Sequence, residues 1–148
     1  MYTLILSLHD IIRWLVLIAG ALTVVFTFVG WLGKRTWTDR ESKFGLLYTI
    51  SIDVQALLGL LLYFFFSPYT TPYFRNFAQG MKDQEARFFL SEHIFWMVIA
   101  LVLAHVGKAR SAKADSDAGK FKNAAIFYTL SFILILIAIP WWRPLLPF

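Results

Sequence analysis

Four long apolar runs divide the chain, and short polar segments separate them. The runs cover residues 4–32, 44–66, 88–107 and 124–142. Each has the roughly 20 residues that an α-helix needs to cross about 30 Å of hydrocarbon. Because helices satisfy their own backbone hydrogen bonds in lipid, each run predicts a transmembrane helix. The pattern predicts an all-α integral membrane protein, an antiparallel four-helix bundle that forms one domain over residues 1–148.

The composition supports a lipid environment and excludes several kinds of site. Hydrophobic residues make up 59% of the chain, and there is no cysteine. Disulfides, iron–sulfur clusters and thiolate metal sites are therefore excluded. The net charge of +5 is compatible with nucleic-acid binding, but the basic residues gather in short loops, as is typical of membrane topology. We expect the lipid bilayer as a partner and no nucleic acid.

The loop charges predict an orientation. Loops 33–43 and 108–122 hold most of the basic residues and are predicted to be cytoplasmic by the positive-inside rule. Both termini and the second loop then lie outside, on the periplasmic side of a bacterial inner membrane. The first run lacks a basic leader, and His9, Asp10 and Arg13 interrupt its start. We therefore expect it to remain as a helix rather than to be removed as a signal peptide.

Ionisable side chains occur within three of the four runs. They are His9, Asp10, Arg13, Asp53, Glu92, His93 and His105. Such groups are costly in lipid, usually face the protein interior, and mark a candidate site. The fourth run has none and is interpreted as structural.

Helical spacing predicts which of these side chains converge. His9 and Arg13 share a stripe of small and polar residues on the first helix, and His93 shares a stripe with alanines and Gly107 on the third. Small residues favour close helix contacts, so these three side chains should face the bundle. Glu92 points about 100° away from His93, towards a neighbouring helix or the outer vestibule. We expect Arg13 and Glu92 to form a buried polar cluster near the outer end.

The depths of His9 and His93 agree only when they are measured from the outer ends of their helices. Each lies about 10 Å below Tyr2 or Arg87, at 1.5 Å per residue. From the inner ends, His9 lies about 37 Å above Lys34, but His93 lies only about 22 Å above Lys108. The shorter outer measure predicts that the two rings can share one ligand.

The second helix is ambiguous. Asp53 lies about 15 Å from the cytoplasmic Lys43, near the bilayer centre, on one stripe of the helix. Gln55 lies on the opposite stripe with Gly59. The spacing leaves open which stripe faces the bundle. His105 is expected at the inner interface, without a special role.

Two classes of function fit these residues. In the first, His9 and His93 are axial ligands of a b-type haem, and Arg13 pairs with a haem propionate. In the second, His9, Asp53, Glu92 and His93 bind a divalent cation such as Zn or Fe, or relay ions or protons. A membrane-anchoring subunit is a third interpretation. The sequence does not identify catalytic residues, and whether the protein is an enzyme is left open. A homo-oligomer is possible and is also left open.

Four short motifs carry a resemblance to a known family. They are LHDIIRW in the first run, QALLGL in the second, MKDQEARFFLSEH at the third, and IPW at the end of the fourth. Together they resemble small four-helix bacterial membrane proteins commonly labelled cytochrome b-like. The resemblance implies haem b, and electron transfer with a quinol or a membrane redox partner near the outer face. Its pattern maps to His9, Arg13, Met81, Lys82, Arg87, Glu92 and His93. A histidine usually stands at the position of Asp53 in that family, which puts a three-histidine site in doubt unless the aspartate replaces it as a ligand.

Overall fold

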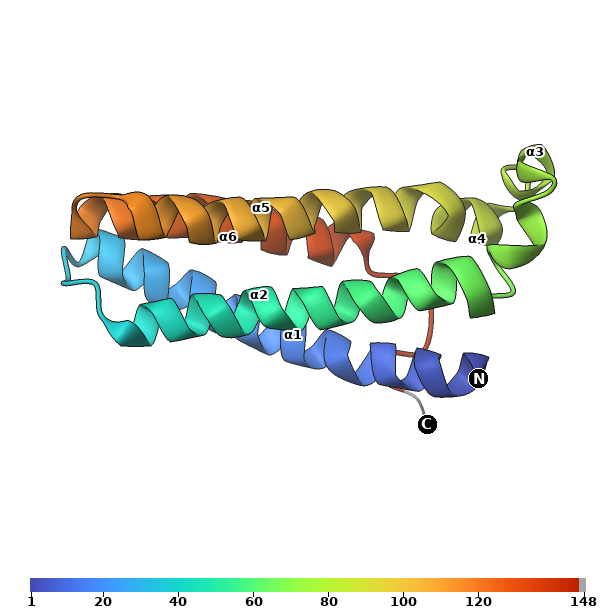
Figure 1. Cartoon of the computed structure of the whole chain (residues 1–148), viewed down its shortest axis with the longest axis horizontal. Helices are drawn as coiled ribbons and strands as arrows, with labels where there is room; N and C mark the ends of the chain where they lie inside the picture. Colours follow the sequence, from blue (N-terminus) through green and yellow to red (C-terminus); the bar gives the residue numbers. More distant parts are fainter. Residues whose placement is uncertain (147–148) are drawn as a thin grey trace.

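The computed structural model describes residues 1–146 as a bundle of four long helical spans (Figure 1). In chain order the elements are α1 (Tyr2–Leu32), α2 (Asp39–Leu61), the π-helix η1 (Leu62–Phe66), the 3₁₀-helix η2 (Thr71–Tyr73), α3 (Phe77–Gly80), α4 (Gln84–Arg87), the π-helix η3 (Phe88–His93), α5 (Ile94–Lys113) and α6 (Asp117–Ala138). The second span joins α2 to η1, and the third joins α4, η3 and α5. The spans are continuous helices that each begin before the predicted apolar run, and the third also continues past its run to Lys113.

Consecutive spans run in opposite directions, as predicted. The turns at residues 33–38 and 114–116 lie at one end, which we call the loop end (Figure 1). The N-terminus, the segment after α6 and the connection over 67–83 lie at the other, which we call the terminal end. All four spans are long and apolar enough to cross a membrane. The prediction of a multi-pass, antiparallel bundle is confirmed, while the side of the membrane that each end faces stays a prediction.

The fourth helix differs at both ends from its predicted run. It begins at Asp117, because the side chain of Ser116 accepts a hydrogen bond from a main-chain N–H of the first turn at 3.1 Å. It ends at Ala138, because Ile139 precedes Pro140 and takes an extended conformation with φ −70° and ψ 131°. The prediction that the helix continues to residue 142 is therefore wrong.

Aromatic rings fill notches at glycines along the bundle. A Cβ atom on Gly30 would lie 2.0 Å from Cε1 of Phe121, and one on Gly45 would lie 2.5 Å from the hydroxyl oxygen of Tyr128. Only glycine allows these helices to approach so closely. Such packing drives helix association in membranes, where the lipid is as apolar as the side chains.

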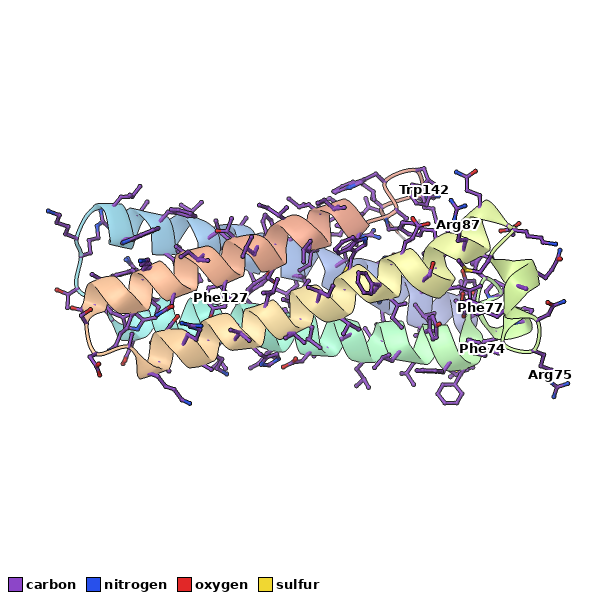
Figure 2. All side chains as sticks on the ribbon, turned by 90° about the horizontal axis from the view of Figure 1, so that it is seen from above. Phe74, Arg75, Phe77, Arg87, Phe127 and Trp142 are labelled. Atoms are coloured by element: carbon purple, nitrogen blue, oxygen red, sulfur yellow. The ribbon has the colours of Figure 1, made fainter. Side chains whose placement is uncertain are left out.

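Several polar groups in the core are paired, whereas most outward-facing side chains of the spans are apolar. The hydroxyls of Tyr48 and Ser131 lie 3.0 Å apart, and Ser131 donates to the main-chain oxygen of Ala100 at 2.7 Å. The outward-facing apolar side chains include Ile11, Ile18, Val25, Leu57, Val98, Val102, Ile133 and Ile137. Charged side chains such as Arg75 project from the terminal end instead (Figure 2). Lipid is the solvent that suits this distribution.

Candidate functional site

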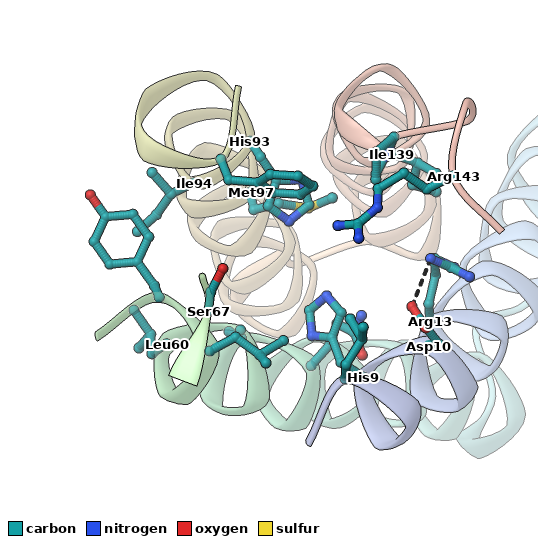
Figure 3. A pocket seen from close by; sticks show the side chains of 18 of the residues that line it. His9, Asp10, Arg13, Leu60, Ser67, His93, Ile94, Met97, Ile139 and Arg143 are labelled. Carbon is teal, nitrogen blue, oxygen red and sulfur yellow. Dashed lines mark hydrogen bonds and ion pairs between the residues drawn. The ribbon is translucent and has the colours of Figure 1, made fainter. Parts of the chain in front are cut away.

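A cavity of about 520 Å³ lies between the spans near the terminal end. His9 and Arg13 of α1, Gln55 of α2 and His93 of η3 line it, together with Arg143 from the segment after α6 (Figure 3). Cofactor and small-molecule sites have volumes of roughly 300–1,000 Å³, with mostly apolar walls and a few polar groups. The cavity has these properties.

The structure brings His9 and His93 together inside this cavity. Their rings point towards each other from α1 and η3 (Figure 3), with centroids 6.4 Å apart and planes inclined by 62°. The depths of His9 and His93 measured from the outer helix ends are about equal and agree with this arrangement. The depths measured from the inner ends are unequal and do not agree with it. The inner measure fails because α5 continues past Lys108 to Lys113, whereas α1 ends at Leu32.

The end of α6 orients His93. The ring Nδ1 lies 2.8 Å from the main-chain oxygen of Ala138. Because a carbonyl oxygen only accepts, Nδ1 carries the hydrogen, and a neutral ring keeps its lone pair on Nε2. Ala138 is the last residue of α6, so its carbonyl lacks the helical partner that a longer helix would provide. The Ile139–Pro140 stop thus supplies the acceptor that leaves Nε2 of His93 available as a ligand.

His9 packs against α2 at Gly59. A Cβ atom on Gly59 would lie 3.3 Å from Cε1 and 3.8 Å from Nδ1 of His9. The buried Nδ1 of His9 has no hydrogen-bond partner within residues 1–146. The His9 ring lies near the main-chain carbonyl of Gln55, one turn before Gly59. His93 therefore turns Nδ1 towards a carbonyl, whereas His9 packs its Cε1 and Nδ1 edge against Gly59 of α2.

Two π-helices, η1 and η3, border the cavity. A π turn adds one residue to a helix, is rare, and occurs mostly at functional sites. Side chains bond to main-chain oxygens within them: the hydroxyl of Tyr63 donates to Leu90 at 3.0 Å, and that of Thr70 donates to Tyr63 at 2.6 Å. His93 is the last residue of η3. Its direction relative to α4 therefore depends on an added residue that regular helical spacing does not anticipate.

Arg13 and Asp10 form a buried ion pair at the edge of the cavity. Nη1 of Arg13 donates to Oδ1 of Asp10 at 3.1 Å, and Nη2 donates to the main-chain oxygen of Leu145. The indole of Trp14 donates to the same oxygen at 3.0 Å. Nε of Arg13 is buried and has no partner in the part of the chain that the structure describes. It is a donor available to an anionic group in the cavity.

A second arginine, Arg143, reaches the cavity from the segment that follows α6. It donates to the hydroxyl of Tyr69 at 3.3 Å, and its Nε lies 3.6 Å from the carboxylate of Glu85. The guanidinium also stacks 4.7 Å from the centre of the Tyr69 ring. Arg143 follows the last run, so it was missed among the ionisable residues considered within the four apolar runs. The available signal was a single charge between Trp142 and Pro144.

Glu92 lies outside the cavity, which corrects the expected buried cluster with Arg13. Its side chain is 48% exposed and accepts a hydrogen bond from Nε of Arg87 at 3.1 Å. Met81 and Lys82 lie in the connection at the terminal end and do not line the cavity. Of the residues in the resemblance, His9, Arg13 and His93 share the site.

Asp53 also lies away from the cavity, on the outer surface of the bundle. Its Oδ1 is 2.7 Å from Nε2 of His105, and both side chains are about half exposed. The opposite stripe of α2, with Gln55 and Gly59, faces the cavity instead. Within residues 1–146, no three His, Cys, Asp or Glu side chains are grouped so that they could hold a metal ion. The four residues of the alternative metal set are not brought together.

The separation of the two rings distinguishes two kinds of metal centre. With ring bonds of about 1.33 Å, an imidazole nitrogen lies roughly 1.1 Å from the ring centroid, and a metal–imidazole bond is about 2 Å long. Two imidazoles on opposite sides of one ion then have centroids roughly 6.3 Å apart, whereas a tetrahedral angle brings them to roughly 5.2 Å. The observed centroid separation of 6.4 Å is compatible with the opposite-side arrangement and is longer than the tetrahedral value.

Comparison of the chain with protein-family models, with curated proteins and with solved structures found no match. The resemblance to cytochrome b-like proteins therefore stays a prediction, and the chemistry of the site rests on its own geometry.

Proposed function

We propose that this protein binds a b-type haem in the membrane, with His9 and His93 as the two axial ligands. The observation that carries the proposal is a pair of imidazoles 6.4 Å apart across a cavity, without a group of three donor side chains in the described residues. A haem brings four nitrogen ligands of its own and needs only axial ligands from the protein. A bare zinc ion needs three or four protein ligands.

The residues around the two histidines fit the same role. An axial imidazole is usually oriented by an acceptor at its other nitrogen. Ala138 supplies this acceptor for His93, and the Gln55 carbonyl near the His9 ring is the candidate acceptor for His9. Arg13 and Arg143 line the same cavity and carry the positive charge that propionates require.

The position of the cavity limits where electrons can be exchanged. When bound, a haem takes up and releases single electrons. His93 lies 20 residues before the end of α5 at Lys113, or about 30 Å from the loop end at 1.5 Å per residue. One site at this depth does not connect the two faces of a bilayer. We propose that a quinol or a membrane-bound redox partner exchanges electrons at the terminal end, which the loop charges predict to be outside.

An absorption spectrum of the purified full chain tests the proposal. Protein produced with added haem should show a Soret band, and a sharp α-band on reduction. His9→Ala and His93→Ala should each abolish the six-coordinate spectrum. His105→Ala is the matched control, because the chain has only three histidines and this one lies outside the cavity.

Two results would contradict the proposal. One is a spectrum that is unchanged in both His9→Ala and His93→Ala. The other is a colourless protein that retains stoichiometric zinc or iron, which would favour the divalent-cation site. Metal analysis of the same preparation distinguishes these outcomes.

A further inference from the structure

Asp53 and His105 form a polar pair on the lateral face of the bundle, at the seam between α2 and α5. Oδ1 and Nε2 are 2.7 Å apart, and the two side chains are 48% and 46% exposed. Asp53 is near the middle of a span, 14 residues after Asp39 and about 20 Å along the helix. The pair therefore lies at a depth where the surrounding solvent is hydrocarbon.

Lipid leaves part of this pair unsatisfied. A net charge is costly at this depth, and the hydrogen bond between Oδ1 and Nε2 shares one proton between the two side chains. Whichever atom holds the shared proton, one donor remains at Nδ1 of His105 and one acceptor remains at Oδ2 of Asp53. Acyl chains offer a partner to neither group.

We propose that the α2–α5 face is a homodimer interface in which this pair meets the same pair of a second copy. A two-fold axis brings each group of one face opposite the other group of its partner. Nδ1 of His105 would then donate to Oδ2 in Asp53 of the partner subunit, and the reverse bond would form equally. One donor and one acceptor on a face can pair with the acceptor and the donor of an identical face. A second copy of this chain therefore fits.

The surroundings of the pair favour a protein surface over a small ligand. Both side chains are about half exposed on the outside of the bundle, so a small molecule there would contact the helices on one side only. Leu57 and Val102 lie one turn from Asp53 and His105 on the same helix faces and are 60% and 53% exposed. They offer apolar surface for a partner helix beside the polar centre.

Cross-linking of the full chain in its membrane tests the geometry. The chain has no cysteine, so a single introduced thiol pairs only with its own copy. Oxidation should cross-link Val102→Cys into a dimer. Ile18→Cys is the matched control, because it is 57% exposed on α1, away from the proposed face. Equal cross-linking at both positions, or a Val102→Cys product that contains a different protein, would overturn the proposal.

Counting of subunits by single-molecule photobleaching in lipid bilayers tests the chemistry. The double variant Asp53→Leu with His105→Leu removes the polar centre and should weaken self-association roughly tenfold, since interhelical hydrogen bonds in membranes are individually modest. The exchange Asp53→His with His105→Asp restores one donor and one acceptor and should restore the dimer. A native chain that is monomeric, or a dimer that the leucine variant leaves unchanged, would contradict the proposal. The leucine variant should keep the spectrum of the native protein, so this test is independent of the proposed haem.

Discussion

The two ends of the bundle are held together by different means. Towards the loop end, rings fit into glycine notches, as Phe121 does at Gly30. At the terminal end, hydrogen bonds and ion pairs surround a cavity, and the segment after α6 folds back to contact Arg13. Close packing tolerates almost no added volume, whereas a polar frame tolerates volume but not the loss of a partner.

The contrast means that residues important for stability alone lie at the loop end, whereas residues around the cavity at the terminal end affect both stability and binding. A cavity reduces van der Waals contact, so the terminal end needs other interactions to keep its helices in place. Buried ion pairs give little net stability relative to apolar packing, but they fix direction, and a lost partner leaves a costly buried charge. We therefore expect substitutions at the loop end to affect unfolding alone, and substitutions at the terminal end to affect both unfolding and the cavity.

The largest effect is expected at Arg13. Arg13→Ala strands the carboxylate of Asp10, which is only 8% exposed, and frees the carbonyl of Leu145. Breaking a buried ion pair costs about 3–5 kcal/mol in unfolding free energy. Thermal unfolding in detergent measures it. Glu92→Gln is the control, and a change within about 0.5 kcal/mol is expected there because its partner is at the surface.

A second variant separates the stranded charge from a general loss of packing. Asp10→Asn combined with Arg13→Ala removes the charge and should recover part of the lost stability. If Arg13→Ala is no more destabilising than Glu92→Gln, then the ion pair does not hold the terminal end together.

An intermediate effect is expected at Gly30, at the loop end. The Cβ of Gly30→Ala would lie 2.0 Å from Phe121, so the ring or the helix must move. Overpacking of this kind costs about 1–3 kcal/mol. Phe121→Leu in the same chain should relieve part of the clash. The absorption spectrum should be unchanged, because Gly30 lies about 30 Å along α1 from His9; an altered spectrum would show that the two ends are coupled.

Much of the fold could be predicted from the lengths of the apolar runs and the charges of the loops, because the thickness of the hydrocarbon layer fixes the length of a transmembrane helix. The convergence of His9 and His93 also follows, since small residues mark the buried stripes of both helices. Helix ends were less predictable. The rule for residues before proline places the stop at Ile139, but an apolar run that continues through Trp142 conceals it.

Other parts of the site depend on tertiary contacts that one sequence does not encode locally. The π turn that ends at His93 changes the helical register without a composition signal. Arg143 reaches the cavity only because the chain reverses after Pro140. The depth of Asp53 could be predicted, but the side to which it points could not, because both stripes of α2 carry polar residues.

The smallest change in stability is expected at Gly59. There the His9 ring packs against a glycine at the terminal end, as Phe121 packs against Gly30 at the loop end. The Cβ of Gly59→Ala would lie 3.3 Å from Cε1 of His9, so the ring needs to shift by only a few tenths of an ångström. Alanine gains up to about 1 kcal/mol in helix propensity over glycine, which offsets this contact. We expect unfolding to change little, while the tilted ring weakens haem binding by up to roughly tenfold. Gly119→Ala is a matched control, because its Cβ meets neighbours at 3.1 and 3.3 Å near the loop end, without a histidine. Haem titration of both variants measures the difference. Equal affinities would mean that Gly59 does not position His9, and the cavity would then tolerate movement of that ring.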